Sequence, residues 1–164
     1  MSLWSALKSI WGRVQRALTR DPWEEILALL SQEYVDKMKD AFQYRRHAEQ
    51  MRYKHFREKL LRIAEDEEKH ARWLKERILA LGGEIPEISS AVEDGWNTWE
   101  DLRLDLAEEK RHKWDVTDQL PMIERFDAET AETLRRILAE EDNHQAQLTD
   151  MLIRSDPLSE YPPS

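Results

Sequence analysis

The sequence lacks cysteine and is poor in the residues that interrupt helices. Its 164 residues include no Cys, 4 Gly and 6 Pro. The absence of cysteine excludes disulfides, thiolate nucleophiles, iron–sulfur clusters and cysteine-based zinc sites. The small number of Gly and Pro argues against a turn-rich β fold. No stretch approaches the roughly 18 consecutive apolar residues of a transmembrane helix, so we expect no membrane-spanning segment.

Charge is abundant and unevenly distributed. Charged residues make up 36% of the chain, and the net charge is −9 at pH 7. Residues 1–20 contain no acidic residue and four basic ones, Lys8, Arg13, Arg16 and Arg20, so their +4 leaves −13 for the remainder. Because phosphate contacts need a basic surface, we expect no nucleic-acid partner. An acidic body can instead host cations.

Hydrophobic periodicity predicts a short basic helix followed by four long helices. The short helix, over residues 2–19, is amphipathic, and it is expected either to dock on the bundle or a partner subunit or to contact an anionic membrane surface. Asp21 and Pro22 mark the start of the next helix, which runs to about residue 50. The helix after it follows a break near residues 51–54 and stops at Gly82-Gly83.

The second half of the chain begins with the only long connection, residues 84–96. Asn97 and Glu100 resemble a capping box at the start of the third long helix. Pro121 and the acidic stretch after it predict a turn, and Asp127 caps the last helix. Two short connections and one long one predict an all-α bundle of two antiparallel hairpins joined by a crossover. We expect the bundle to occupy residues 21–155, between a basic N-terminal segment (1–20) and a tail (156–164).

An internal repeat of 74 residues relates the second and fourth long helices. It superposes Glu67 on Glu141 and His70 on His144, so that both helices contain Glu-x-x-His. Positions i and i+3 point to one side of a helix, where a carboxylate and an imidazole can bind the same ion. All four residues continue apolar stripes, as Glu109 does on the third helix. Ionised groups on a buried face are costly unless they are paired or bound to a metal.

Other polar residues are predicted to lie away from this layer. Glu108, next to Glu109, falls on a polar stripe with Asp101 and Asp115. Three histidines stand near helix ends or among charges and are expected to face solvent: His47, His55 and His112. Tyr34 and Tyr44 continue an apolar stripe and are expected to be core residues with a hydrogen-bonded hydroxyl.

The sequence resembles the ferritin-like superfamily, in particular its bacterioferritin and rubrerythrin branch, over about residues 23–153. The similarity lies in residues 63–71, IAEDEEKHA, which precede Leu81-Gly-Gly, and in Tyr44 with His47-Ala48. The resemblance implies a ferritin-like four-helix bundle whose metal ligands are Glu67, His70, Glu109, Glu141 and His144. It also implies one or two iron ions, with manganese as the second choice, and reactions with oxygen or peroxide.

Several family features are absent. Without cysteine there is no rubredoxin-type iron centre, so electrons must come from an external donor. The methionine that binds haem in bacterioferritins is replaced by Glu68, so no haem is expected. We further expect a homodimer or higher oligomer in the cytoplasm, with membrane association through residues 2–19 as an alternative location.

The first long helix departs from the family pattern. Lys37 stands where the family has a glutamate, about seven residues before Tyr44, and the apolar stripe also passes through this position. In one interpretation Lys37 points inward and pairs with Glu67 or Glu141, which leaves one metal ion or none. In a second, a nearby acidic residue substitutes as ligand: Glu33, Asp36 or Asp40. In a third, the register is wrong and Lys37 reaches solvent.

Two functions follow from these interpretations. The first is a metal-binding protein that handles iron, oxygen or peroxide, as a ferroxidase, peroxidase or similar rubrerythrin-like oxidoreductase. The alternative is a degenerate, metal-free bundle in which Lys37 closes an ion-pair network and the protein acts as a dimeric binding or scaffold module. The sequence leaves open whether the protein is an enzyme.

Overall fold

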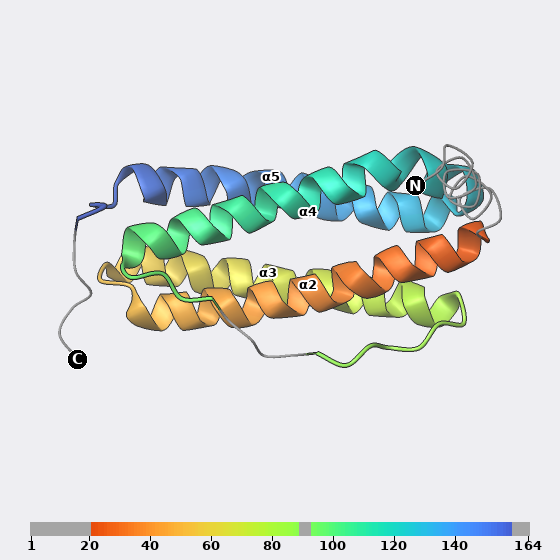
Figure 1. The fold of residues 1–164 in the computed structure, drawn as a ribbon, viewed down its shortest axis with the longest axis horizontal. Coiled ribbons are helices and arrows are strands. Elements are labelled where there is room, and N and C mark those ends of the chain that lie inside the picture. The colour runs from red at the N-terminus through yellow and green to blue at the C-terminus, as the bar shows by residue number, and fades with distance from the viewer. Residues whose placement is uncertain (1–20, 89–92, 159–164) are drawn as a thin grey trace, which may run out of the picture.

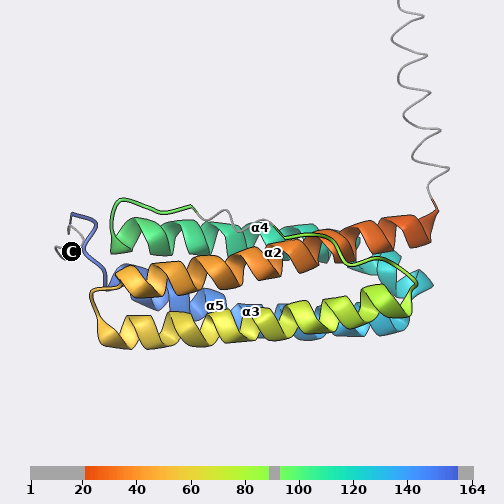
Figure 2. The ribbon, with the colours of Figure 1, turned by 90° about the horizontal axis from the view of Figure 1, so that it is seen from below.

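A computed structural model describes residues 21–88 and 93–158 of the chain. The described residues form four long helices and no strand: α2 (Pro22–Gln50), α3 (Lys54–Ala80), α4 (Thr98–Phe126) and α5 (Ala128–Ile153). The helices form two antiparallel hairpins, α2 with α3 and α4 with α5 (Figure 1). The described residues between α3 and α4, 81–88 and 93–97, run along the bundle (Figure 2). The predicted all-α four-helix bundle is therefore confirmed, while the predicted helix at 2–19 lies outside the described residues.

The predicted helix starts are capped as the sequence indicates. The Asp21 carboxylate accepts a hydrogen bond from the Trp23 backbone N–H at 3.0 Å, and the Asn97 side chain accepts one from Glu100 at 2.9 Å. Asp127 accepts one from the Thr130 backbone N–H at 3.2 Å. At the end of α3, Gly82 adopts a φ of 76°, a left-handed conformation that favours glycine.

The turn predicted at Pro121 is wrong. Helix α4 continues through Pro121 to Phe126, and the chain turns only at Asp127. Proline removes one backbone hydrogen bond from a helix interior. The turn that follows is held by tertiary packing, because Ile123 is fully buried in the core and its carbonyl accepts from the Asp127 backbone N–H.

The core consists of two apolar clusters at opposite ends of the bundle. One contains residues of the N-terminal half of α2 and the C-terminal half of α3, such as Leu30 and Leu74. The other contains residues of the opposite halves, such as Met51 and Leu60. On α3, α4 and α5 the five predicted ligands fall between the residues of the two clusters, as Lys37 does on α2. The candidate site is therefore a polar layer enclosed by apolar packing on both sides.

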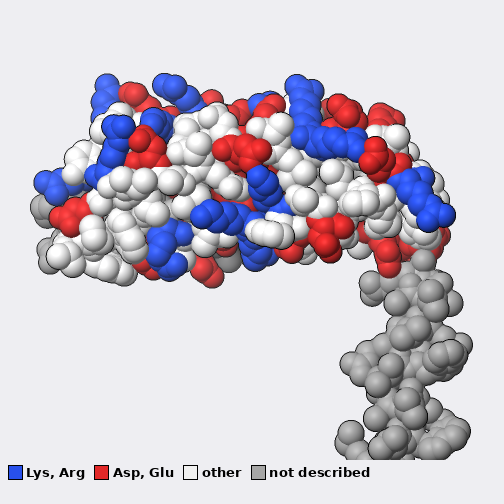
Figure 3. Space-filling view, turned by 90° about the horizontal axis from the view of Figure 1, so that it is seen from above, with Lys and Arg blue, Asp and Glu red and all other residues white. Residues whose placement is uncertain are grey.

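The described surface carries mixed charge, and none of the described helices is long and apolar enough to cross a membrane. Figure 3 shows basic and acidic side chains interspersed over one face of the bundle.

Candidate metal centre

The five predicted ligands converge in the middle of the bundle. All are at most 1% exposed, and they come from α3, α4 and α5. Their ligand atoms form two groups whose members lie within 4.8 Å of one another. One group is Glu67, Glu109 and His144, and the other is Glu67, His70 and Glu141. The site thus has two halves that share Glu67.

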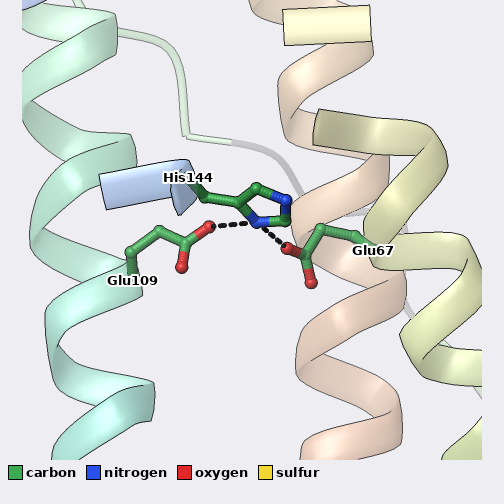
Figure 4. A group of neighbouring side chains, drawn as sticks. All are labelled: Glu67, Glu109 and His144. Atoms are coloured by element: carbon green, nitrogen blue, oxygen red, sulfur yellow. Dashed lines mark ion pairs between the residues drawn. The ribbon is translucent and has the colours of Figure 1, made fainter. Parts of the chain in front are cut away.

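The first half, which we call the His144 half, contains no lysine. Figure 4 shows Glu67, Glu109 and His144 pointing toward one another from three helices. The His144 Nδ1 lies 2.9 Å from Glu67 Oε1 and 3.5 Å from Glu109 Oε1. The Tyr44 hydroxyl donates to Glu109 Oε1 at 2.7 Å, as expected for a core tyrosine. One nitrogen and two carboxylate oxygens therefore face a common point.

The second half, the His70 half, is occupied by Lys37. The Lys37 side chain is fully buried, and its Nζ lies 3.3 Å from Glu67 Oε2 and forms an ion pair with Glu141 Oε1. The His70 Nδ1 lies 3.4 Å from the same Glu67 oxygen. The inward orientation of Lys37 is confirmed, and the interpretation that it reaches solvent is wrong. Neither half includes one of the proposed substitutes on α2: Glu33, Asp36 or Asp40.

The outer nitrogens of both histidines bind carboxylates of the opposite helix. His70 Nε2 lies 2.9 Å from Glu140 Oε2, and His144 Nε2 lies 3.4 Å from Asp66 Oδ2. Lys69 contacts both carboxylates, at 2.5 Å from Asp66 and 2.7 Å from Glu140. Such contacts fix the orientation of metal-binding imidazoles. Here they turn the Nδ1 of each ring toward the centre.

The charges of the site are strongly coupled. Burial lowers the pKa of Lys37, but the nearby carboxylates of Glu67, Glu141 and Glu109 outweigh it and hold this pKa well above its ordinary value. Burial raises the pKa of Glu67, yet Lys37 and the two histidines bring it well below its ordinary value. Lys37 is therefore a charged ammonium, and Glu67 is an ionised carboxylate.

The His144 half also binds a proton strongly. Burial lowers the pKa of His144, but the adjacent carboxylates of Glu109 and Glu67 raise it to about 10. Burial raises the pKa of Glu109. A metal ion in this half must therefore displace the proton between the His144 ring and the two carboxylates.

Several buried atoms of the site make no hydrogen bond, although some are in ion pairs. They are Glu67 Oε1 and Oε2, His70 Nδ1, Glu109 Oε2, Glu141 Oε2 and His144 Nδ1. Buried polar atoms are rarely left in this state. The Lys37 Nζ also makes no hydrogen bond. Since Glu67 Oε1, Glu109 Oε2 and His144 Nδ1 are potential metal-ligand atoms, the donor set fits a cation in the His144 half. It does not fit two metal ions, because Lys37 stands in the His70 half.

Two histidines that were expected to face solvent are buried, so this prediction is wrong for His47 and His112, whereas His55 is exposed. His47 Nδ1 lies 2.9 Å from Asp105, and its Nε2 donates to the Glu93 carbonyl at 2.9 Å. The prediction failed because these rings are paired with acidic residues across the α2–α4 interface.

The same pairing explains a second correction. Asp101, predicted on a polar stripe, is fully buried 3.4 Å from His47 Nε2. His112 lies 3.1 Å from Asp40 and 3.6 Å from Asp36. The sequence did contain a signal for this burial: two acidic residues stand four positions apart on each helix, Asp36 and Asp40 on α2 and Asp101 and Asp105 on α4.

The chain is similar to ferritin-like proteins in sequence pattern and in fold. The family described as "Ferritin: Ferritin-like domain" matches residues 30–155. Among solved structures, a similar one is a dodecameric thioferritin, a bacterioferritin-related protein from Bacteroides fragilis. The two are 18% identical, the match covers 80% of this chain and 86% of that chain, and the TM-score is 0.73. No protein with a curated description matches the sequence.

Proposed function

Because the chain belongs to the ferritin-like domain family, we propose that it binds one divalent metal ion in the His144 half of its buried centre. The observation that carries the proposal is the position of Lys37, whose ammonium pairs with Glu67 and Glu141 in the other half. An ammonium and a dication repel each other in the same half-site. One half therefore holds the metal ion, and the other holds the lysine.

The ligand types indicate which metal is bound. Carboxylate oxygens and an imidazole nitrogen suit iron and manganese. Iron is the first choice and manganese the second, with Glu67, Glu109 and His144 as ligands. Of the other two predicted ligands, Glu141 pairs with the ammonium, and His70 Nδ1 lies 3.4 Å from the Glu67 oxygen that the ammonium contacts. Haem is not part of the proposal.

We propose further that the protein handles iron, oxygen or peroxide, as a rubrerythrin-like oxidoreductase. A bound iron ion would supply one-electron redox chemistry, and the protein's own residues prepare its surroundings. Tyr44 holds a proton 2.7 Å from Glu109, Asp66 orients the His144 ring, and the apolar clusters exclude bulk water. Reducing one peroxide to two waters takes two electrons and two protons. The electrons come from iron(II) in solution or from an external donor.

The proposal also covers the oligomeric state of the protein and its cellular location. We expect a homodimer or larger homo-oligomer in the cytoplasm, in line with the similar thioferritin, which is described as dodecameric. Exposed aromatic side chains such as Trp114, which is 76% exposed, are suited to such contacts.

Peroxide-dependent oxidation of iron(II) tests the redox part of this function. Wild-type protein is expected to oxidise iron(II) with hydrogen peroxide at least tenfold faster than iron(II) in buffer, measured by absorbance in stopped flow. Glu109→Ala should lose the acceleration, because it removes one ligand of the His144 half. Equal rates for the two proteins would contradict the redox role.

A second candidate function is a metal-free binding or scaffold module. It is favoured by the two ion pairs of Lys37 and by the position of the His144 ring between two carboxylates, since these cations belong to the protein itself. Metal analysis after iron-supplemented expression separates the two candidates. Fewer than ~0.2 ions per chain would support the scaffold, given the usual affinity of structural sites.

A further inference from the structure

A hollow of about 420 Å³ lies between the N-terminal half of α2 and the C-terminal half of α4, outside the metal centre. We call it the α2/α4 hollow. Its lining includes four carboxylates, Glu25, Glu33, Asp36 and Asp115, and one basic side chain, Arg111. No described residue of the crossover lines it. The hollow is therefore a negatively charged recess in the side of the bundle.

Glu33 is a buried acidic residue of this recess whose carboxylate has no partner among the described residues. It is only 4% exposed, yet its carboxylate makes no hydrogen bond or ion pair with a residue that the structure describes. Burial raises its pKa to about 7, although Lys37 and His112 act in the opposite direction. Burying a carboxylate without a partner is costly. A cation in the hollow would remove that cost.

Two of the other three acids of the hollow, Asp36 and Asp115, have partners. Asp36 accepts from the Gln32 amide at 3.0 Å and lies 3.6 Å from His112 Nε2. Asp115 lies 4.0 Å from Arg111. Glu33 is thus the buried acid of the hollow without a partner among the described residues, and it follows the half-buried Glu25 on the same helix by about two turns.

The lining indicates which kind of cation fits. The ligand atoms around Glu33 do not converge closely enough to form one of the two compact groups of the described chain that could hold a bare ion. A hydrated ion needs no such convergence, because its water molecules reach the protein. Six waters occupy on the order of 180 Å³ at about 30 Å³ each, which fits the hollow. Such waters would donate hydrogen bonds, and the lining offers acceptors for them in its carboxylates and in the Gln32 and Gln119 amide oxygens.

We propose that the α2/α4 hollow binds a hydrated divalent metal ion through the Glu33 carboxylate and the neighbouring acids. The site is separate from the buried centre and stands whether or not that centre holds a metal. Glu33 precedes Lys37 by one helical turn, so the bound ion lies just outside the polar layer.

Cobalt(III) hexammine tests this proposal without involving the centre. Its six ammine ligands do not exchange, so it mimics a hydrated ion and cannot coordinate to Glu67, Glu109 or His144. Calorimetric titration of the full chain at low ionic strength is expected to show one saturable site, which millimolar Mg²⁺ or Mn²⁺ displaces. Glu33→Gln should weaken binding at least tenfold.

Two further variants distinguish binding at the hollow from non-specific attraction of a cation to the acidic protein surface. Glu76→Gln, which removes an exposed acid of α3 away from the hollow, should change the affinity less than twofold. Arg111→Gln should raise it at least threefold, because it removes the basic side chain of the lining. Equal affinities of wild type and Glu33→Gln would overturn the proposal. So would tight binding of spermidine with none of hexammine, since the hollow would then select an organic cation.

Discussion

Replacing Lys37 by glutamate is expected to raise the number of metal ions bound per chain from one to two. In the wild type the Lys37 ammonium pairs with Glu67 Oε2 and Glu141 Oε1 and occupies the His70 half. Lys37→Glu removes this cation and adds a carboxylate at the position where the family has one. Two carboxylates that already face this half, together with His70, then surround a vacant cation position. Elemental analysis of dialysed, iron- or manganese-loaded protein measures the change.

Lys37→Met is the matched control for this experiment. It removes the ammonium but adds no ligand, so we expect a stability loss of about 3–5 kcal/mol, the usual cost of breaking a buried ion pair. Saturating Mn²⁺ should restore part of that stability, as measured by urea unfolding. If Lys37→Glu is folded by circular dichroism and still binds one ion or none, Lys37 does not exclude the second metal.

Removing a ligand from the His144 half is expected to weaken metal binding far more than removing His70. His144→Ala or Glu109→Ala should lower the affinity for Mn²⁺ at least 100-fold, because each takes away one of three ligands. His70→Ala should lower it less than tenfold, because His70 belongs to the half that Lys37 occupies. Competition titration against a fluorescent chelator measures all three affinities under one condition.

The two histidines are comparable in burial and in the contact that each makes through Nε2. Both are buried, and both bind a carboxylate of the opposite helix through Nε2. Both variants leave a similar cavity, so a general loss of stability would affect them alike. Equal losses of affinity in His70→Ala and His144→Ala would mean that the metal uses both halves, and the assignment to one half would be wrong.

Much of the centre could be predicted from single helices. Glu67, His70, Glu141 and His144 each continue an apolar stripe, and a residue on that stripe must point into the bundle whatever its partners are. The same periodicity located Lys37. The caps at Asp21 and Asn97 were likewise predictable, because they depend only on local backbone hydrogen bonds.

Other features depend on how helices pair, and no single helix contains that information. The periodicity placed Lys37 inside but left open which half it occupies. That choice follows from the approach of α2 to Glu67 and Glu141 in the folded bundle. The burial of His47 and His112 rests on acids of the other helix at the α2–α4 interface. Pro121 was misinterpreted because the packing of Ile123 outweighs a local preference.

Anomalous diffraction from crystals grown with Mn²⁺ locates the bound metal ion directly. We expect one peak in the buried layer, bound by Glu67, Glu109 and His144, with the Lys37 ammonium still between Glu67 and Glu141. A second buried peak on the His70 side, a single peak there, or no peak in the layer at saturating Mn²⁺ would contradict this expectation.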